Sequence, residues 1–254
     1  RRRFLIEELL RERLSCRRQE IPADTDRQKV LLRSLMNVRH PGAISQRFLE
    51  VQDAYLQGEL AAKKITRLSE LSPLQNGIYL WRGDITTLDC GAIVNAANSG
   101  MTGSYQPCHN CIDNCIHTYA GVQLRLKCAE IMERQGFEEP TGQAKITPAY
   151  NLPCDYVIHT VGPIVQGKLT RQHCKLLESC YRSCLTLADE NQVPSIAFCC
   201  ISTGVFMFPN DKAAEIAVRT VQEYKAETGS KIEVIFNVFK EQDERIYSKL
   251  LRAD

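Results

Sequence analysis

The sequence predicts an α/β fold in which helices cover both faces of a central sheet, preceded by a helical N-terminal extension. From about residue 76 onward, short β-rich runs alternate with helical stretches, which is the pattern of layered α/β proteins. The run "SIAFCCI" (195–201) is apolar throughout, as expected of a strand covered on both faces. Residues 1–70 show only helical patterns. We therefore predict a helical extension over 1–70 and an α/β domain over 71–254.

The extension is expected to contain two further helices after an N-terminal helical run. The segment 24–40 begins with a helix N-cap signature at Asp24 or Thr25 and ends before Pro41. The segment 44–65 carries an apolar stripe at helical spacing. Because no motif with catalytic or ligand-binding residues lies here, we expect the extension to pack on the α/β domain. The alternative is an independent module that binds a partner.

The α/β domain is predicted to alternate strands and helices along its whole length. Strands are expected at 78–81, 92–97, 145–147, 156–161, 195–201 and 232–239. Helices are expected at roughly 112–135, 170–191, 210–228 and 241–252. In such sheets ligands bind beyond the carboxyl ends of the strands. The loops that follow the strands are therefore the candidate binding site.

Polar residues and glycines cluster after three of these strands, in the segments 82–86 ("RGDIT"), 98–114 ("NSGMTGSYQPCHNCIDN") and 202–209 ("STGVFMFP"). The last segment is a Ser-Thr-Gly turn that leads into a helix expected to begin near Asn210. The backbone N–H groups of such a turn and the helix N-terminus can face an anion. Turns of this kind also serve as plain connectors, so this loop alone leaves both interpretations open.

The composition excludes several classes of protein. Hydrophobic residues make up 44% of the chain and charged residues 24%, which argues against disorder. The formal net charge of +2, without a basic stripe and interleaved aromatic residues, argues against nucleic-acid binding. No apolar run approaches the ~18 residues of a membrane span. Because Glu7, Glu8 and Glu12 interrupt the N-terminal segment, we also expect no signal peptide.

Most of the twelve cysteines lie inside apolar runs, where free cysteine behaves as a small buried hydrophobe. We expect core positions for Cys180, Cys184, Cys199 and Cys200. Unpaired cysteines in this number are typical of a reducing compartment, so we expect a cytoplasmic protein.

The segment 103–121 concentrates metal-binding residue types. Cys108, His109 and Cys111 lie within four consecutive positions, next to a helix expected to begin near Ile112. The positive end of a helix dipole favours a thiolate there. Two thiolates and one imidazole would leave the fourth position of a tetrahedral zinc site open, which is the catalytic arrangement.

Two further residues of this segment leave alternatives open. Cys115 could face the same site or be buried under the sheet, and His117 is expected to pack or to orient other groups rather than to bind metal. The C-x2-C-x3-C spacing also permits an iron–sulfur cluster.

The motif series of the α/β domain resembles that of macrodomains, over about residues 76–254 and in the same order. The matching motifs are "GDIT" (83–86), "AIVNAAN" (92–98), "IDNCIHTYAG" (112–121), "IHTVGP" (158–163) and "ISTGVFMFP" (201–209). The resemblance implies a three-layer α/β/α sandwich with a mixed central sheet. It also implies that ADP-ribose binds in a cleft at the strand ends.

The loop at 107–111 and the helical extension resemble one subgroup of macrodomains. Where the common hydrolases of the family carry a glycine run, this chain has "PCHNC" (107–111), and it also has a helical extension. Both features resemble the zinc-dependent bacterial macrodomains, which remove ADP-ribose from proteins and are often encoded beside a sirtuin-like transferase and a lipoate-carrier protein. Their Cys, His and Cys zinc ligands fall here on Ser104, His109 and Cys111.

Ser104 departs from that pattern, because neutral serine is a poor zinc ligand. Three explanations stay open: a weakened site, Cys108 in place of the missing thiolate, or binding without metal. Two functions therefore remain. The chain is expected to be a zinc-dependent hydrolase that removes mono-ADP-ribose from protein carboxylates; the alternative is an ADP-ribose reader with little or no metal.

The resemblance also implies roles for residues near the adenine and the distal ribose. Asp84 would accept hydrogen bonds from the adenine amino group, and Ile85 would add a backbone N–H. Asn98 would fix the distal ribose through its amide. Asp113 would position water there, or would instead be the N-cap or first-turn acid of its helix.

The pyrophosphate would lie against the loop after the strand at 195–201. The matching residues are Ser202, Thr203, Gly204, Val205 and Phe206. Within this loop, Gly204 allows close backbone approach and Phe206 would cover the distal ribose. Phe239 or Asn237 would flank the adenine, and Asn95 is expected to be structural.

Overall fold

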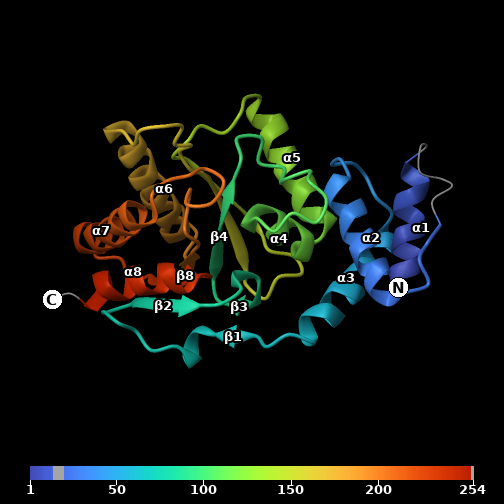
Figure 1. The fold of residues 1–254 in the computed structure, drawn as a ribbon, viewed down its shortest axis with the longest axis horizontal. Helices are drawn as coiled ribbons and strands as arrows, with labels where there is room; N and C mark the ends of the chain where they lie inside the picture. The colour runs from blue at the N-terminus through green and yellow to red at the C-terminus, as the bar shows by residue number, and fades with distance from the viewer. Residues whose placement is uncertain (14–19, 253–254) are drawn as a thin grey trace.

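The computed structural model describes residues 1–13 and 20–252 and divides them between two hydrophobic cores. The smaller core belongs to the extension, whose helices are α1 (Arg2–Glu12), α2 (Thr25–Val38) and α3 (Gln46–Ala61). Leu5, Leu32 and Phe48, one from each helix, are almost fully buried in it, and Val122 of the α/β domain joins them. The extension therefore packs on the rest of the chain, at the right of Figure 1.

The larger core surrounds a six-stranded mixed sheet with the order β2-β8-β7-β4-β6-β5. Its strands are β2 (Ile78–Arg82), β4 (Ala92–Ala97), β5 (Ala144–Pro148), β6 (Tyr156–Val161), β7 (Ser195–Phe198) and β8 (Glu233–Val238). Only β5 runs antiparallel to its neighbour. The central strands β4 and β7 are mostly buried apolar residues, which is the composition expected when helices cover both faces.

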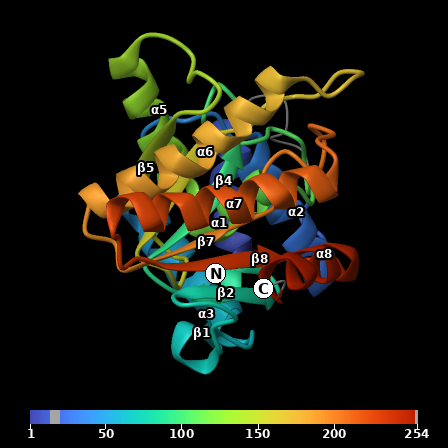
Figure 2. The same cartoon turned by 90° about the vertical axis from the view of Figure 1, so that its left-hand side faces the viewer.

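Five helices complete the α/β domain. They are α4 (Ile112–Ala120), α5 (Val122–Gln135), α6 (Arg171–Glu190), α7 (Asn210–Thr228) and α8 (Glu241–Arg252). Helices α6, α7 and α8 pack side by side along the sheet, and α4 and α5 lie between the sheet and the extension (Figures 1 and 2). A short pair, β1 (Thr66–Arg67) and β3 (Leu88–Asp89), connects the extension to the sheet region. The predicted three-layer arrangement is confirmed.

Two predicted elements differ from the structure. The helix expected over 112–135 is two helices, because Gly121 has a φ of 101° and ends α4 before α5 begins. The strand expected over 195–201 ends at Phe198. Beyond it the backbone turns sharply, with Ile201 N–H donating to Cys199 O at 2.9 Å. The apolar character of the residues after Phe198 reflects burial rather than strand pairing.

Several local predictions are confirmed. Asp24 caps α2, since its carboxylate accepts a hydrogen bond from the Arg27 N–H. Cys180, Cys184 and Cys199 are buried, and Cys200 is partly buried. Across the ranges that the structure describes, the cysteines are all free, and no helix is long and apolar enough to cross a membrane.

Candidate functional site

The three polar loops predicted from the sequence leave the sheet at the same edge. Strands β2, β7 and β4 run parallel to one another through β8, so their carboxyl ends point the same way. The loops that follow them are 83–87, 199–209 and 98–111. A ligand at this edge would contact all three loops, as expected for an α/β sheet.

Asp84 caps a turn with one carboxylate oxygen and leaves the other without a hydrogen bond from any described residue. It precedes the short helix η3 (Ile85–Thr87), and its Oδ1 accepts hydrogen bonds from Thr86 N–H at 2.9 Å and Thr86 Oγ1 at 2.6 Å. The other oxygen, Oδ2, lies 3.8 Å from Lys63 Nζ, and 44% of the Asp84 side chain is exposed. The neighbouring Ile85 side chain is buried. This geometry permits the adenine-binding role predicted for Asp84.

Asn98 organises the start of the 98–111 loop. Its Oδ1 accepts hydrogen bonds from Gly100 N–H at 3.1 Å and Met101 N–H at 3.2 Å, and its Nδ2 donates to Gly103 O at 3.1 Å. The residue is nevertheless exposed. Asn98 is therefore accessible to a ligand, and its amide already fixes the loop around it.

Asp113 is buried in the first turn of α4, where only 5% of it is exposed. The N-cap of this helix is Cys111, so the first-turn position is the structural role that Asp113 has. Asn95 Nδ2 donates to Asp113 Oδ1 at 2.8 Å, which gives Asn95 the structural role expected of it. Burial raises the pKa of Asp113 to about 6, although the Asn95 hydrogen bond and the Arg125 charge oppose this. Its role in positioning water stays a prediction.

The 199–209 loop is held by its own backbone. Phe208 N–H donates to Ser202 O at 2.9 Å, and Met207 N–H donates to Gly204 O at 3.0 Å. Ser202 has a φ of 65°, and a Cβ at Gly162 would lie 2.1 Å from its Oγ. A side chain at position 162 would therefore force the Ser202 and Ile201 side chains to move.

The tip of this loop is open to a ligand. Gly204 has no atom within 4 Å of a Cβ built on it, and Val205 is 74% exposed. Thr203 and Phe206 are partly buried beside them. The tip can therefore approach a pyrophosphate closely, as the sequence predicts.

The two residues expected near the adenine differ in their environment. Asn237 is buried, and its Nδ2 donates to Gly83 O at 3.0 Å, which ties β8 to the loop that carries Asp84. Phe239 is 78% exposed directly beyond β8. Phe239 is thus the one available to stack on a ligand.

In the loop expected to bind zinc, the candidate ligands make hydrogen bonds within the protein. Cys111 is a helix N-cap whose Sγ accepts from Asn114 N–H at 3.5 Å, and burial raises its pKa, contrary to the lowering expected from the helix dipole. His109 Nδ1 accepts from Cys111 N–H at 3.2 Å. Cys108 Sγ instead lies 3.2 Å from Ser34 Oγ of α2.

Zinc binding by Ser104, His109 and Cys111, or with Cys108 in place of Ser104, stays a prediction. Within the described ranges, the ligand atoms of Cys108, His109 and Cys111 do not all lie within 4.8 Å of one another. At the remaining position Ser104 has a neutral hydroxyl, which accepts from Gln106 N–H at 3.3 Å. Of the three positions that the resemblance implies, only His109 and Cys111 have side chains that zinc prefers.

A buried polar layer of His117, Cys128 and His159 lies beneath this loop, with ligand atoms within 4.8 Å of one another. His159 Nε2 is engaged with Thr147 Oγ1 at 2.9 Å, and burial lowers the pKa of His159 to about 3. A Cβ at Gly103 would lie 2.9 Å from His117 Cδ2, so the loop backbone rests on the imidazole. This contact supports the packing role expected of His117.

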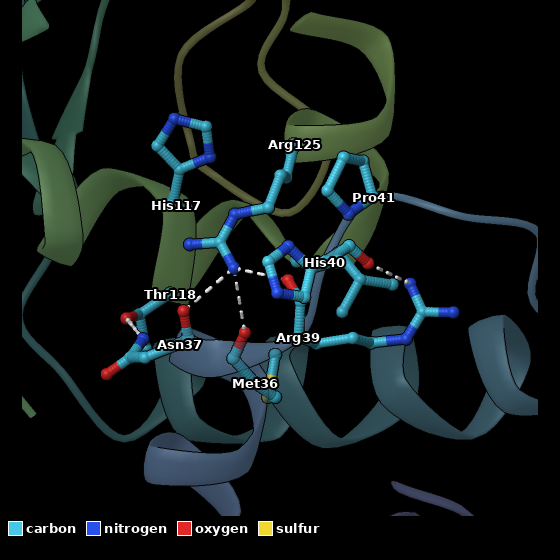
Figure 3. Close-up of a pocket in the computed structure, with 10 residues that line it drawn as sticks. Met36, Asn37, Arg39, His40, Pro41, His117, Thr118 and Arg125 are labelled. Atoms are coloured by element: carbon cyan, nitrogen blue, oxygen red, sulfur yellow. Dashed lines mark hydrogen bonds between the residues drawn. The ribbon is translucent and has the colours of Figure 1, made fainter. Parts of the chain in front are cut away.

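Sequence reasoning missed Arg125 of α5, which is 5% exposed and joins the loop to the extension. Its guanidinium donates to Thr102 O at 2.7 Å and Ser104 O at 3.4 Å. The same guanidinium donates to three carbonyls at the end of α2, those of Met36, Asn37 and Arg39 (Figure 3). A single arginine in an amphipathic helix carries no sequence signal for such a role.

Comparison with known proteins relates the chain to one family. Residues 94–217 match the family described as Macro domain. A protein-ADP-ribose hydrolase of Treponema medium is 63% identical over 255 residues, covering 99% of this chain and 98% of that protein. A protein-ADP-ribose hydrolase of Staphylococcus aureus (strain MSSA476) is 49% identical over 253 residues, covering 99% and 95%.

Solved structures agree with this assignment. The Trypanosoma brucei macrodomain in complex with ADP-ribose superposes with a TM-score of 0.67 at 30% identity, covering 86% of this chain and 94% of that one. The Oceanobacillus iheyensis macrodomain with ADP gives a TM-score of 0.64 at 34% identity, covering 72% and 94%.

Proposed function

The chain belongs to the macro domain family, and from that premise we propose that it is a protein-ADP-ribose hydrolase. It removes mono-ADP-ribose from modified carboxylate side chains of proteins. The observation that carries the proposal is the meeting of three loops at one sheet edge, each with a residue suited to a different part of ADP-ribose: Asp84, the 202–206 turn and Asn98.

Binding in this proposal is divided among those loops. Asp84 Oδ2 accepts hydrogen bonds from the adenine amino group, while Oδ1 keeps its turn in place. The backbone at Thr203, Gly204 and Val205 approaches the pyrophosphate, and Phe206 covers the distal ribose. Charge-assisted hydrogen bonds of this kind orient the ligand as well as hold it.

The reaction breaks the bond between the anomeric carbon of the distal ribose and a carboxylate oxygen. Water supplies the hydroxyl, and the products are ADP-ribose and a free carboxylic acid. Asn98 fixes the distal ribose, and Asp113, in the first turn of α4, positions the water. Positioning of this kind lowers the barrier because the reacting groups no longer lose freedom of movement at the transition state.

The proposal also includes a bound zinc ion. We propose that His109 and Cys111 hold the ion weakly, with Ser104 at the position of a third ligand. Among the described residues of this loop no three ligand atoms lie within 4.8 Å of one another, so no step of the reaction is assigned to the metal.

The proposed partner follows from the same resemblance, and the proposed compartment follows from the cysteines. We propose that the substrate is an ADP-ribosylated protein, with a lipoate-carrier protein as one candidate. The free cysteines of the described residues favour a reducing compartment, so we propose a cytoplasmic location.

The decisive experiment measures release of ADP-ribose from an aspartate- or glutamate-modified protein, with and without a strong zinc chelator. The proposal predicts release that the chelator slows. Release that the chelator leaves unchanged would retain the hydrolase but remove zinc, and would place the chemistry on Asp113.

Ser104 favours a second candidate function, an ADP-ribose reader. A reader would bind ADP-ribose in calorimetry but release none from the modified protein over many hours. Ser104→Cys is the variant that separates a reader from a disabled hydrolase, because it restores the implied thiolate and only a disabled hydrolase would gain activity.

A further inference from the structure

We propose that α2 of the N-terminal extension is a positioning element for the 102–111 segment, acting through Arg33 and Asn37. The proposal rests on the proposed hydrolase function. It states that hydrolysis depends on these extension residues, whereas binding of free ADP-ribose does not.

Arg33 reaches from α2 to the far end of the segment. Its Nη2 donates to His109 O at 2.8 Å and to Asn114 Oδ1 at 3.2 Å, and lies 3.8 Å from Cys115 Sγ. Asn114 in turn donates to Gln106 O at 2.9 Å. One guanidinium therefore connects the backbone at His109 to the first turn of α4.

Asn37 holds the middle of the segment. It is 2% exposed, and its Oδ1 accepts from Cys108 N–H at 2.8 Å while its Nδ2 donates to Thr118 Oγ1 at 2.9 Å. Cys108 has a φ of 54°, a conformation that non-glycine residues rarely adopt. The bond from Asn37 stabilises that conformation directly beside His109.

Arg125 completes the attachment from the other side. Figure 3 shows its guanidinium pointing at the end of α2, where it meets the carbonyls of Met36 and Asn37. The same side chain donates to Thr102 O and Ser104 O, so the Arg125 guanidinium links the start of the segment to the end of α2. The cavity at this junction measures about 10 Å³, which is room for about one water molecule. The junction is therefore closely packed.

The segment has few backbone bonds of its own, in contrast to this set of side-chain contacts. Within the described residues, His109 N–H to Gln106 O at 3.3 Å is its one internal backbone hydrogen bond. Without α2, the segment would sample other conformations. A displacement of about 1 Å at a reacting group can cost about 100-fold in rate.

The extension also offers a matched control contact far from the segment. Gln57 of α3 donates to Asn151 O at 3.1 Å and to Asn151 Oδ1 at 3.2 Å. Gln57→Met therefore removes an extension contact without touching residues 102–111. Arg33→Met removes the guanidinium but keeps the long apolar stem, and Arg33→Lys keeps the charge.

The test compares the full-length chain carrying Arg33→Met, Arg33→Lys or Gln57→Met. For Arg33→Met we expect kcat for a carboxylate-modified protein to fall at least about tenfold, with KM and the Kd for ADP-ribose within about threefold. Amide exchange over 106–114 should rise about fivefold or more, since the hydrogen bonds to His109 O and Asn114 Oδ1 are lost. Arg33→Lys should recover part of kcat, and Gln57→Met should match wild type.

Equal kcat and equal exchange in Arg33→Met and Gln57→Met would overturn the proposal. So would a parallel loss of ADP-ribose affinity in Arg33→Met, since that would mean general damage to the cleft. If the wild type itself releases no ADP-ribose, the proposed hydrolase fails. The difference in amide exchange between the two variants still decides whether α2 positions the segment.

Discussion

The two loops that flank the candidate cleft, 199–209 and 98–111, are held in place by different means. The first is closed by backbone bonds among its own residues, such as Phe208 N–H to Ser202 O. The second owes its shape to the Asn98 side chain and to side chains that come from α2 and α5, namely Arg33, Asn37 and Arg125. A locally closed loop depends on its own sequence, whereas a loop fixed by distant side chains depends on the docking of other elements.

This difference indicates how affinity for ADP-ribose and the rate of hydrolysis can depend on different loops of one cleft. The locally closed loop carries the turn proposed to bind pyrophosphate, and the remotely held loop carries Asn98, His109 and Cys111. Changes in the extension should therefore alter the reaction more than they alter affinity for ADP-ribose. The predictions below test that separation.

The largest effect is expected from Arg125→Met. The substitution leaves buried carbonyls of α2 and of the 98–111 loop without a donor, so the free energy of unfolding should fall by about 3–5 kcal/mol. Denaturant titration measures this loss. Arg182→Met is the matched control: Arg182 pairs with exposed Glu223 and Glu227, and its removal should cost less than about 1 kcal/mol. Similar losses in the two variants would show that Arg125 does not join the two elements.

The next effect is on binding. Asp84→Ala should weaken ADP-ribose binding by about 10- to 100-fold, since a charge-assisted hydrogen bond to the adenine is lost. Calorimetry gives the Kd. Asp84→Ser keeps a helix-capping hydroxyl but lacks the reach of the carboxylate, so it should lose affinity without losing stability. Unchanged affinity in both variants would remove Asp84 from the cleft.

A pair of glycine substitutions compares the two loops directly. Gly103 has a φ of 87°, and a Cβ there would lie 2.9 Å from the His117 ring, so Gly103→Ala should cost about 1–3 kcal/mol of stability. Gly204 lies in open space, so Gly204→Ala should leave stability within about 0.5 kcal/mol. It should instead weaken ADP-ribose binding. Thermal unfolding measures the stability of both variants, and calorimetry measures their affinity for ADP-ribose. A Gly204→Ala variant less stable than Gly103→Ala would contradict this comparison of the two loops.

The smallest expected change is in metal content. Ser104→Cys supplies a third zinc ligand beside His109 and Cys111, and should raise the zinc bound per chain without altering the fold. Elemental analysis after gel filtration measures it, with Ser99→Cys as a control outside the motif. Full and equal zinc occupancy in wild type and Ser104→Cys would contradict a weakened site and favour another ligand.

The sequence predicted the sheet well because each strand carries a local signal. The alternating pattern, the apolar run at 195–201 and the N-cap at Asp24 all depend on neighbouring residues. The structure departs from the predicted elements at Gly121, after Phe198, and at Thr66–Arg67, a short strand at the end of the segment predicted to be helical. A glycine inside a helical pattern can continue the helix or adopt a positive φ and end it, and the local sequence does not distinguish the two outcomes. A strand end is equally hard to locate inside an apolar run.

The candidate site was predictable only in part. The motifs located Asp84, Asn98 and the 202–206 turn on loops that the structure brings to one edge. They gave no indication of Arg33, Asn37 or Arg125. The contacts that link α2 to the rest of the site join residues more than seventy positions apart in the sequence, such as the 76 positions between Arg33 and His109. A polar contact between single side chains far apart in the sequence produces no repeating pattern of residues from which it could be predicted.

The most direct test of the division between binding and chemistry compares wild type with His109→Asn. Asparagine keeps an acceptor for the Cys111 N–H but is a weak zinc ligand, so the loop should keep its shape. Single-turnover release of ADP-ribose from a carboxylate-modified protein is measured beside the Kd for ADP-ribose. We predict that release slows by about 100-fold or more while the Kd stays within about threefold. Equal release rates in the two proteins would show that His109 takes no part in the reaction, and would contradict the proposed division between the two loops.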